Sequence, residues 1–225
     1  MTTLVLCSHG TADARGQELV RRLAAAVRAR ASTSVREAVV DVEDHRLEDV
    51  LGAVVGPAVV VPLLLSGGFH VHHDIVAAAS ARPGTSVAAP LGPDWALAEL
   101  AVQRLRSAGC RAGDVVLLGA SGSSDARAMA DVDEAAARLG ALWGGEVGVG
   151  HLGHRGVPIA DVVRRARAGA SRVVVSSYLL APGYFQDRLR ECGADIVTAP
   201  LLSPSPPTDL IELVLRRAST AAFVS

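Results

Sequence analysis

Apolar residues occur along the chain in short continuous blocks, and each block predicts a buried β-strand. Such blocks, mostly of Val, Leu and Ala, lie at 4–6, 38–42 (which includes Asp41), 58–65 (which includes Pro62), 115–118 and 173–175. Strands that are buried on both faces give continuous apolar runs, which are typical of parallel sheets covered by helices. Between the blocks, apolar residues recur at helical spacing, as in Leu19, Val20, Leu23 and Val27. The pattern therefore predicts alternating strands and helices.

The same pattern occurs twice in the chain. Segment 8–15 aligns with 120–127, segment 59–70 aligns with 174–185, and Ala-Pro-Leu at 89–91 recurs at 199–201. Each half is predicted to run strand, loop, helix, strand, helix, strand, loop, helix, strand, helix. We therefore predict an α/β fold of two tandem doubly wound parallel-sheet domains, 1–112 and 113–225. Because ligands of such sheets bind beyond the carboxyl ends of the strands, we expect the domains to face a central cleft.

Composition favours a globular protein and gives no sign of nucleic-acid binding. Half of the 225 residues are hydrophobic, a fifth are charged, and the net charge is −1. There is no basic tract, no apolar run near the roughly 20 residues of a membrane span, and no signal-peptide pattern, so we expect a cytoplasmic protein. Cys7, Cys110 and Cys192 are widely spaced and odd in number, which argues against a disulfide framework. Every one of the 22 basic side chains is arginine, so an anion site here uses Arg or backbone N–H groups.

Three residues with metal-binding side chains follow predicted strands. His9 comes directly after the first strand, and Glu43 comes directly after the run 38–42. His70 follows the run 58–65 through Gly67-Gly68. The carboxyl ends of parallel strands share one edge of a sheet, so these side chains are expected to converge there. Two imidazoles and a carboxylate suit a divalent ion of the Fe, Co, Ni or Zn group.

Each of these residues also has a structural interpretation. His9 is alternatively a capping or packing residue, and Glu43 a solvated carboxylate. His72 and His73 are adjacent, so at most one of them faces a cleft. The remaining histidines, His45, His151 and His154, are expected on the surface or in loops. Asp13, Arg15 and Arg127 recur in both halves, which fits helix-start electrostatics as well as substrate binding.

Two segments resemble the signatures of the sirohydrochlorin chelatases, which are class II tetrapyrrole chelatases. Segment 4–11, which ends in Ser8-His9-Gly10-Thr11, resembles the family's opening motif. Segment 60–75 is similar to its longer second signature, V-x-P-L/F-L-L-x-x-G-x-H-V-x-x-D-I. The two-repeat layout resembles the long, single-chain members of the family, so the resemblance extends over nearly the whole chain.

The resemblance implies a lyase-type chelatase that inserts Fe²⁺, for sirohaem, or Co²⁺, for cobalamin, into sirohydrochlorin without ATP; nickel is a further metal of the family. It implies His9 and His70 as the catalytic pair, and His9, Glu43 and His70 as the metal site. No cofactor beyond the metal substrate is implied. In the second half, Ser121 and Phe185 stand where the first half has the two histidines, so a single catalytic pair is expected.

The chemistry of metal insertion fits these residue types. Two pyrrole protons must leave and the metal must shed ligands, and imidazole, with an ordinary pKa of about 6.5, suits both steps. We expect the flat ring to contact Gly10, Gly68, Phe69 and Tyr184, with Phe185 close by. Its carboxylates need donors, for which Arg15, Arg46, Arg127 and Arg155 are candidates.

Two other functions compete with the chelatase interpretation. Ser-His-Gly after a strand is faintly similar to phosphohistidine phosphatases, but the arginine beside the histidine is missing here. A non-catalytic carrier of metal or tetrapyrrole is the main alternative, and it would bind stoichiometrically without turnover. Because one chain holds both repeats, we expect a monomer whose partners are the tetrapyrrole and the metal ion.

Overall fold

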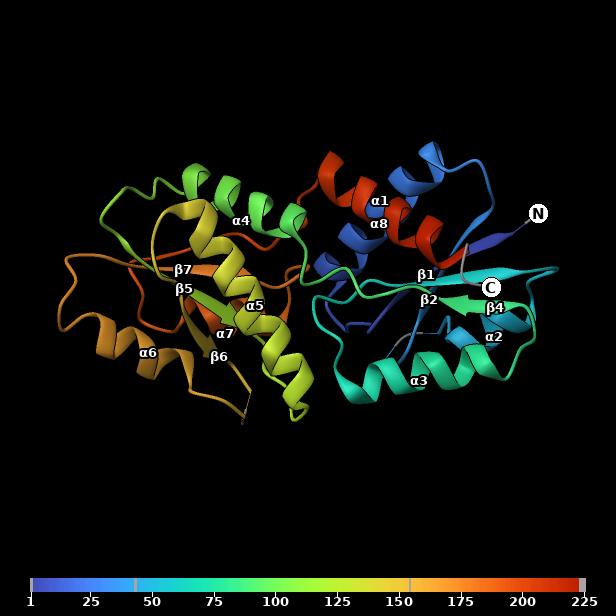
Figure 1. The fold of residues 1–225 in the computed structure, drawn as a ribbon, viewed down its shortest axis with the longest axis horizontal. Helices are drawn as coiled ribbons and strands as arrows, with labels where there is room; N and C mark the ends of the chain where they lie inside the picture. Colours follow the sequence, from blue (N-terminus) through green and yellow to red (C-terminus); the bar gives the residue numbers. More distant parts are fainter. Residues whose placement is uncertain (1, 43, 154, 223–225) are drawn as a thin grey trace. The chain divides into compact units, whose positions relative to one another are not determined.

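A computed structural model describes residues 2–42, 44–153 and 155–222, with the side chains of these ranges except for 69–72 and 222. The described chain forms two compact units. Each of them contains one four-stranded parallel sheet with helices on both faces (Figure 1). The predicted fold class, two doubly wound α/β domains, is confirmed.

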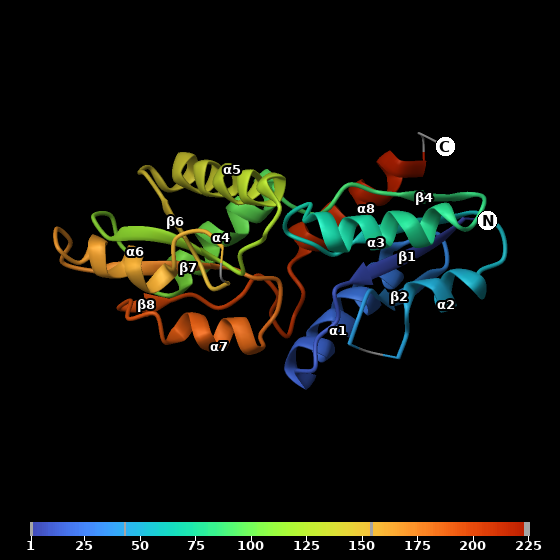
Figure 2. The same ribbon diagram turned by 90° about the horizontal axis from the view of Figure 1, so that it is seen from below.

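Unit 1 comprises Met1–Leu91 and Pro204–Ser225. Its sheet has the order β2-β1-β3-β4, in which every pair is parallel. The strands are β1 (Thr3–Ser8), β2 (Val35–Val39), β3 (Ala58–Pro62) and β4 (Thr85–Val87). Helices α1 (Ala14–Arg30) and α8 (Thr208–Ala222) cover one face, and α2 (Leu47–Gly52) and α3 (Phe69–Ser80) cover the other, as Figures 1 and 2 show.

Unit 2 comprises Gly92–Ser203 and repeats this plan with the order β6-β5-β7-β8. Its strands are β5 (Val115–Ala120), β6 (Gly148–His151), β7 (Val173–Tyr178) and β8 (Ile196–Val197). Helices α4 (Trp95–Ser107) and α5 (Ala126–Trp143) lie on one face, and α6 (Ile159–Ala166) and α7 (Tyr184–Arg190) lie on the other (Figures 1 and 2).

The continuous apolar runs are buried on both faces, as the pattern predicts. Val59, Val60 and Val61 of β3 are each at most 4% exposed, although successive side chains point to opposite sides of the sheet. Val60 contributes to the core under α2 and α3, where Leu51 and Ile75 pack against it. Two helical layers are therefore required to bury each sheet.

Two predicted strands end earlier than the apolar runs indicate. The run 38–42 is not a strand to its end, because β2 stops at Val39 and the chain then forms a loop in which the Val39 N–H donates to the carbonyl of His45, 2.9 Å away. In the run 58–65 the strand ends at Pro62, and one further backbone bond follows, from the Leu63 N–H to the carbonyl of Cys7 at 2.7 Å. Asp41 and Val42, and likewise 63–65, are therefore loop residues.

The last helix of each sequence half packs on the sheet of the other half. Helix α4 is the last helix of the first half in sequence but contacts α5 and β7, whereas α8, the last helix of the second half, contacts α1, β3 and β4. The compact units are thus 1–91 with 204–225, and 92–203, whereas the division into 1–112 and 113–225 describes the repeats in the sequence. Helical periodicity shows that a helix buries one face but does not show which sheet covers that face.

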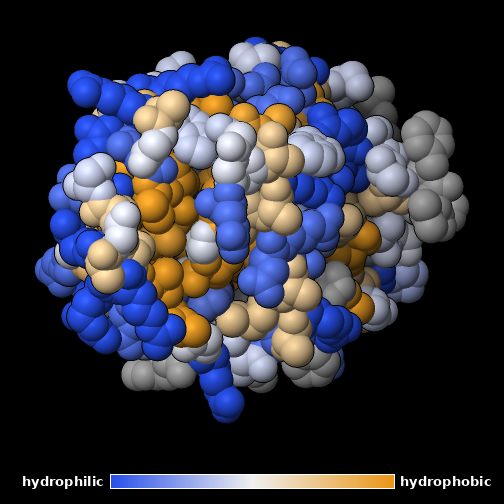
Figure 3. All heavy atoms as spheres, turned by 60° about the vertical axis from the view of Figure 1, so that its left-hand side comes forward, coloured by the Kyte–Doolittle hydropathy of each residue, from blue (hydrophilic) through white to orange (hydrophobic). Residues whose placement is uncertain are grey.

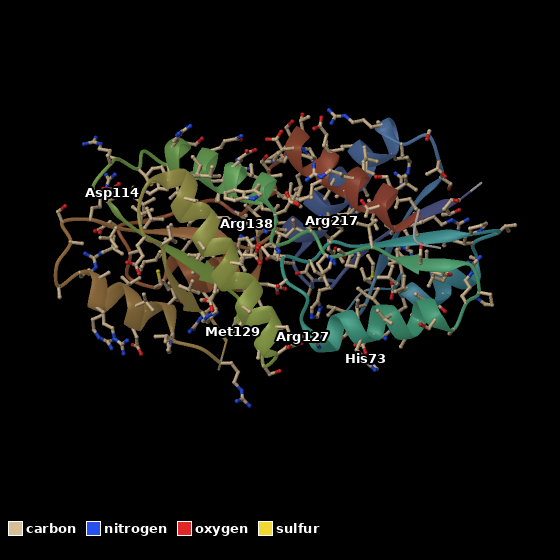
Figure 4. The ribbon with its side chains drawn as sticks, in the orientation of Figure 1. His73, Asp114, Arg127, Met129, Arg138 and Arg217 are labelled. Atoms are coloured by element: carbon tan, nitrogen blue, oxygen red, sulfur yellow. The ribbon has the colours of Figure 1, made fainter. Side chains whose placement is uncertain are left out.

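Two arginines at matching positions of the exchanged helices bind the ends of the Ala-Pro-Leu segments. Arg217 of α8 (Figure 4) donates from Nε to the carbonyl of Pro90 at 2.8 Å and from Nη2 to that of Leu91 at 3.1 Å. Arg104 of α4 donates to the carbonyl of Leu201 at 2.8 Å, and burial lowers its pKa from the ordinary value. Each exchanged helix is therefore fixed to the segment that leaves the sheet it covers.

Among the described residues, no helix is long and apolar enough to cross a membrane. On the face drawn in Figure 3, hydrophobic areas are bordered by hydrophilic residues.

Candidate active site at the carboxyl edge of the first sheet

His9 is exposed and lies immediately after β1, at the carboxyl edge of the sheet in unit 1. Its backbone is fixed by the loop that follows β2. The Asp41 N–H donates to the carbonyl of His9 at 3.1 Å, and the Val40 N–H donates to that of Ser8 at 3.0 Å. Two of the three loops predicted to form the site are therefore joined by backbone hydrogen bonds.

Gly10 permits this close approach. Its φ is +94°, in the left-handed region, and a Cβ at this position would overlap the carbonyl oxygen of Asp41. Glycine is required here because a side chain has neither the room nor the favoured backbone conformation. The structural reason for Gly10 is thus contact with this chain's own backbone, and its contact with a bound ring stays a prediction.

The loop after β2 contains a residue in an unusual conformation. Val42 has φ +74°, which is unfavourable for a β-branched residue, and its side chain is exposed. Asp41 stabilises the turn, since its Oδ1 accepts the Val42 N–H at 2.8 Å and lies 3.5 Å from Nη2 of Arg46. Backbone strain of this kind is found at functional sites, where the surrounding structure holds it in place. Glu43, which follows, lies outside the described residues.

The third loop follows β3, the strand next to β1 in the sheet. Residues 63–68 lead into α3, whose first turn contains the backbone of Phe69 and His70; their side chains lie outside the described set. Gly68 is the N-cap of α3, with φ −59°, a value that other residues adopt as well. The two predicted catalytic histidines therefore follow neighbouring strands on one edge of one sheet.

His73 is the one member of the pair His72 and His73 whose side chain is described. It is 64% exposed on α3, with Nδ1 3.8 Å from Oδ1 of Asp74 (Figure 4). Among the described side chains, no group of three or more His, Cys, Asp and Glu is arranged to hold a metal ion. Two of the three predicted ligands, Glu43 and His70, are not in that set, so the predicted metal site stays a prediction.

The matching edge of unit 2 presents aromatic side chains. Tyr184 is 70% exposed and Phe185 is 43% exposed at the start of α7, and their ring centroids are 5.5 Å apart in an edge-to-face arrangement. Phe185 stands where the first half has His70. In a chain with seven aromatic residues, two large exposed rings side by side form an apolar surface that suits a flat ligand.

The candidate arginines of the helix starts have partners within the chain. Arg15 pairs with Asp13, the N-cap of α1, at 2.6 Å, and this hydrogen bond lowers the pKa of Asp13 to about 2. Arg127 (Figure 4) lies 3.5 Å from Asp125, the N-cap of α5, so helix-start electrostatics accounts for both residues. Arg155 is exposed in the loop after β6, and His154 beside it lies outside the described residues. Binding of substrate carboxylates by any of these arginines stays a prediction.

A buried polar cluster that was not predicted from the sequence lies behind the aromatic pair. Ser177, Gln186 and Thr198 are each at most 2% exposed and are joined by hydrogen bonds. The available signal was the pair Ser176-Ser177, which interrupts the apolar run of β7 where the first half has Val61-Pro62.

The expectation that His151 is a surface or loop residue is wrong. His151 is the last residue of β6 and is 5% exposed, and a Cβ on Gly156 would overlap its ring. Nδ1 of His151 is buried and makes no hydrogen bond to the described residues. Burial lowers the pKa of His151, and the charge of Asp133 opposes this shift.

A lowered pKa makes the stability of the fold depend on pH. Below the ordinary pKa of 6.5, the unfolded chain binds a proton at His151 that the native state does not bind. We therefore expect the free energy of unfolding to be highest above about pH 6.5 and to fall as the solution is acidified toward the lowered native pKa. His151→Leu should reduce the difference between the urea midpoints at pH 7.5 and 5.5. An equal pH dependence in His151→Leu and the wild type would contradict this assignment.

Comparison with known families gives a match in both halves of the chain. The CbiX family model matches residues 3–108 and again residues 115–219. No protein of curated function matches the sequence.

Solved structures with the same fold include two of SirB. SirB from Bacillus subtilis with Fe³⁺ has a TM-score of 0.80 at 22% identity, over 99% of this chain and 96% of that chain. The sirohydrochlorin chelatase SirB from B. subtilis subspecies spizizenii, in complex with cobalt, has a TM-score of 0.77 at 21% identity, over 99% and 95%. CbiX, described as the terminal enzyme for biosynthesis of siroheme in denitrifying bacteria, has a TM-score of 0.65 at 20% identity, over 96% and 99%.

Proposed function

The chain belongs to the CbiX family over both of its halves, and from this membership we propose that it is a sirohydrochlorin chelatase. The proposed reaction is ATP-independent insertion of Fe²⁺ or Co²⁺ into the tetrapyrrole. The related SirB structures contain Fe³⁺ or cobalt, and the related CbiX is described as acting in the biosynthesis of siroheme.

The observation that carries the proposal is the placement of His9. This exposed imidazole follows β1, and the adjacent strand β3 leads into the helical turn that contains His70. Open α/β sheets bind their ligands at this edge. The backbone hydrogen bonds from the loop after β2 fix His9 and bring the segment that precedes Glu43 to the same edge.

The residues then have separate tasks in the proposed reaction. His9 and His70 take up the two protons that leave the pyrrole nitrogens and hold the metal substrate until the ring binds it. Glu43 adds a negative charge that attracts the divalent cation. A ligand set of two imidazoles and one carboxylate leaves coordination positions open, and an ion that must be released to the macrocycle needs such positions.

The macrocycle has an apolar face and carboxylate side chains, and both have counterparts in the chain. We propose that Tyr184 and Phe185 pack against the ring, together with Phe69, while Gly10 and Gly68 allow close approach of the backbone. Arginine supplies the donors for the carboxylates, since the chain has no lysine. The central cleft, the monomeric state and the cytoplasmic location remain predictions from the sequence.

An insertion assay tests the proposal directly. Purified protein is mixed with sirohydrochlorin and Co²⁺ or Fe²⁺ under anaerobic conditions, and the absorbance change of the ring is compared with the spontaneous rate. Turnover above the spontaneous rate, with more product than enzyme, is the expected result. Stoichiometric binding of ring or metal without acceleration would instead favour the carrier.

A further inference from the structure

The first turn of α7, which carries the exposed aromatic pair, is fixed to the ends of two strands by a buried polar network. The Ser177 hydroxyl donates to Oε1 of Gln186 at 2.6 Å, and Nε2 of Gln186 donates to the carbonyl of Thr198 at 3.0 Å. Oγ1 of Thr198 in turn accepts the N–H of Ser177 at 2.9 Å. Gln186, the third residue of α7, thus links Ser177 of β7 to Thr198 beyond β8.

The first half of the chain has no such network at the matching positions. The N–H of Ala88 donates to the carbonyl of Val60, and the N–H of Thr198 donates to the carbonyl of Val175, which is the matching residue of β7. Ala88 therefore occupies the position of Thr198. Pro62 stands at the position of Ser177, and since proline has no N–H, it needs no acceptor there. The third residue of α3 is Val71, where α7 has Gln186. Three positions without polar side chains in one repeat are therefore polar in the other.

A buried polar network of this kind favours one arrangement over its alternatives. Apolar side chains tolerate small shifts, whereas hydrogen bonds between buried groups are lost when one partner moves. Moving the start of α7 would leave the Ser177 hydroxyl and the Thr198 carbonyl without their partner in the interior. Tyr184 and Phe185 directly precede Gln186, so their backbone is fixed by the same contacts.

We propose that Gln186 is a positioning residue for the tetrapyrrole, which holds Tyr184 and Phe185 in the orientation that receives the flat face of the ring. This inference rests on the proposed function. In this proposal, the polar residues that are particular to the second repeat serve the binding of the tetrapyrrole. The first repeat holds the metal ion and takes up the protons. Gln186 itself is 1% exposed and acts through the two aromatic residues.

The test compares Gln186→Val, which installs the residue of the first repeat, with the wild type. We expect the Kd for sirohydrochlorin, measured without metal by quenching of the ring's fluorescence, to rise about tenfold because the aromatic surface is no longer held. The KM for sirohydrochlorin should rise in parallel, while kcat and the KM for Co²⁺ stay within about twofold. Thr198→Val removes the hydroxyl that accepts the Ser177 N–H but keeps both hydrogen bonds of Gln186, so it should give a smaller rise in the Kd for sirohydrochlorin.

Leu139→Ala is the control for a merely structural role. Leu139 is 1% exposed on α5, on the opposite face of the same sheet, and its truncation lowers the stability of unit 2 without touching α7. An equal Kd for the ring in Gln186→Val and Leu139→Ala, at temperatures where both are folded, would overturn the positioning role alone. Failure of the wild type to bind sirohydrochlorin would overturn the proposed function and this inference together.

Discussion

Replacing either His9 or His70 by alanine is expected to reduce metal insertion into sirohydrochlorin to the spontaneous rate. Proton transfer by a positioned base contributes about 10²–10⁴-fold to a rate, and loss of a metal ligand adds to this effect. Since the two histidines are proposed to act on one ring as a pair, either single substitution should cost nearly as much as both. The measurement is the initial rate with sirohydrochlorin and Co²⁺, with the folded state of each variant checked by circular dichroism.

His45→Ala is the matched control for these two substitutions. His45 is exposed in the loop after β2, and its backbone carbonyl, not its side chain, accepts the hydrogen bond from the Val39 N–H. Its side chain can therefore be removed without loosening the loop, and we expect activity within about twofold of the wild type. Full activity in both His9→Ala and His70→Ala would mean that the catalytic groups lie elsewhere, and the second unit would be the first place to look.

The order of strands and helices in each half follows from the apolar pattern, because burial on both sheet faces leaves a continuous run that is difficult to mistake. The ends of the strands do not follow as well. Val40 and Val42 extend the apolar run beyond the point where β2 stops, although Val40 is only partly buried and Val42 is exposed. Strand ends are set by hydrogen bonding between distant segments, such as the bond from Val39 to His45, and local composition does not report it.

The parts of the site that depend only on the order of strands and loops could be predicted from the sequence. His9 and His70 follow parallel strands, and their placement at one edge of the same sheet was expected from the fold class; that the two strands are neighbours was not predicted. The contact of Gly10 with the loop of Asp41 could not be predicted from the sequence, because a glycine can occur in a strand-to-helix loop for many structural reasons. The burial of His151 and the network around Gln186 also depend on which loop covers which strand end. These are tertiary contacts, on which residue spacing carries no information.

Gly10→Ala is expected to destroy most of the activity and to lower stability strongly, although glycine and alanine differ by one methyl group. The left-handed φ alone costs an alanine about 1–2 kcal/mol. The added Cβ also overlaps the carbonyl oxygen of Asp41, which belongs to the backbone and has little freedom to move. Relief of this overlap must separate the His9 loop from the loop after β2 and break the hydrogen bond from Asp41 to His9. Since a misplacement of about 1 Å can cost about 100-fold in rate, we expect a loss of at least that size in the insertion assay.

Gly113→Ala separates the two causes, because Gly113 has nearly the same φ, +95°, but open space around its Cβ position. Its free energy of unfolding should fall by the conformational penalty alone, about 1–2 kcal/mol, with activity retained. Gly10→Ala should lose about 2 kcal/mol more than this control in urea unfolding, since overlap with the backbone adds to the penalty. Equal losses of stability in the two variants, with insertion intact in Gly10→Ala, would show that the His9 loop adapts. In that case, contact between the two loops would not be what places His9 for catalysis.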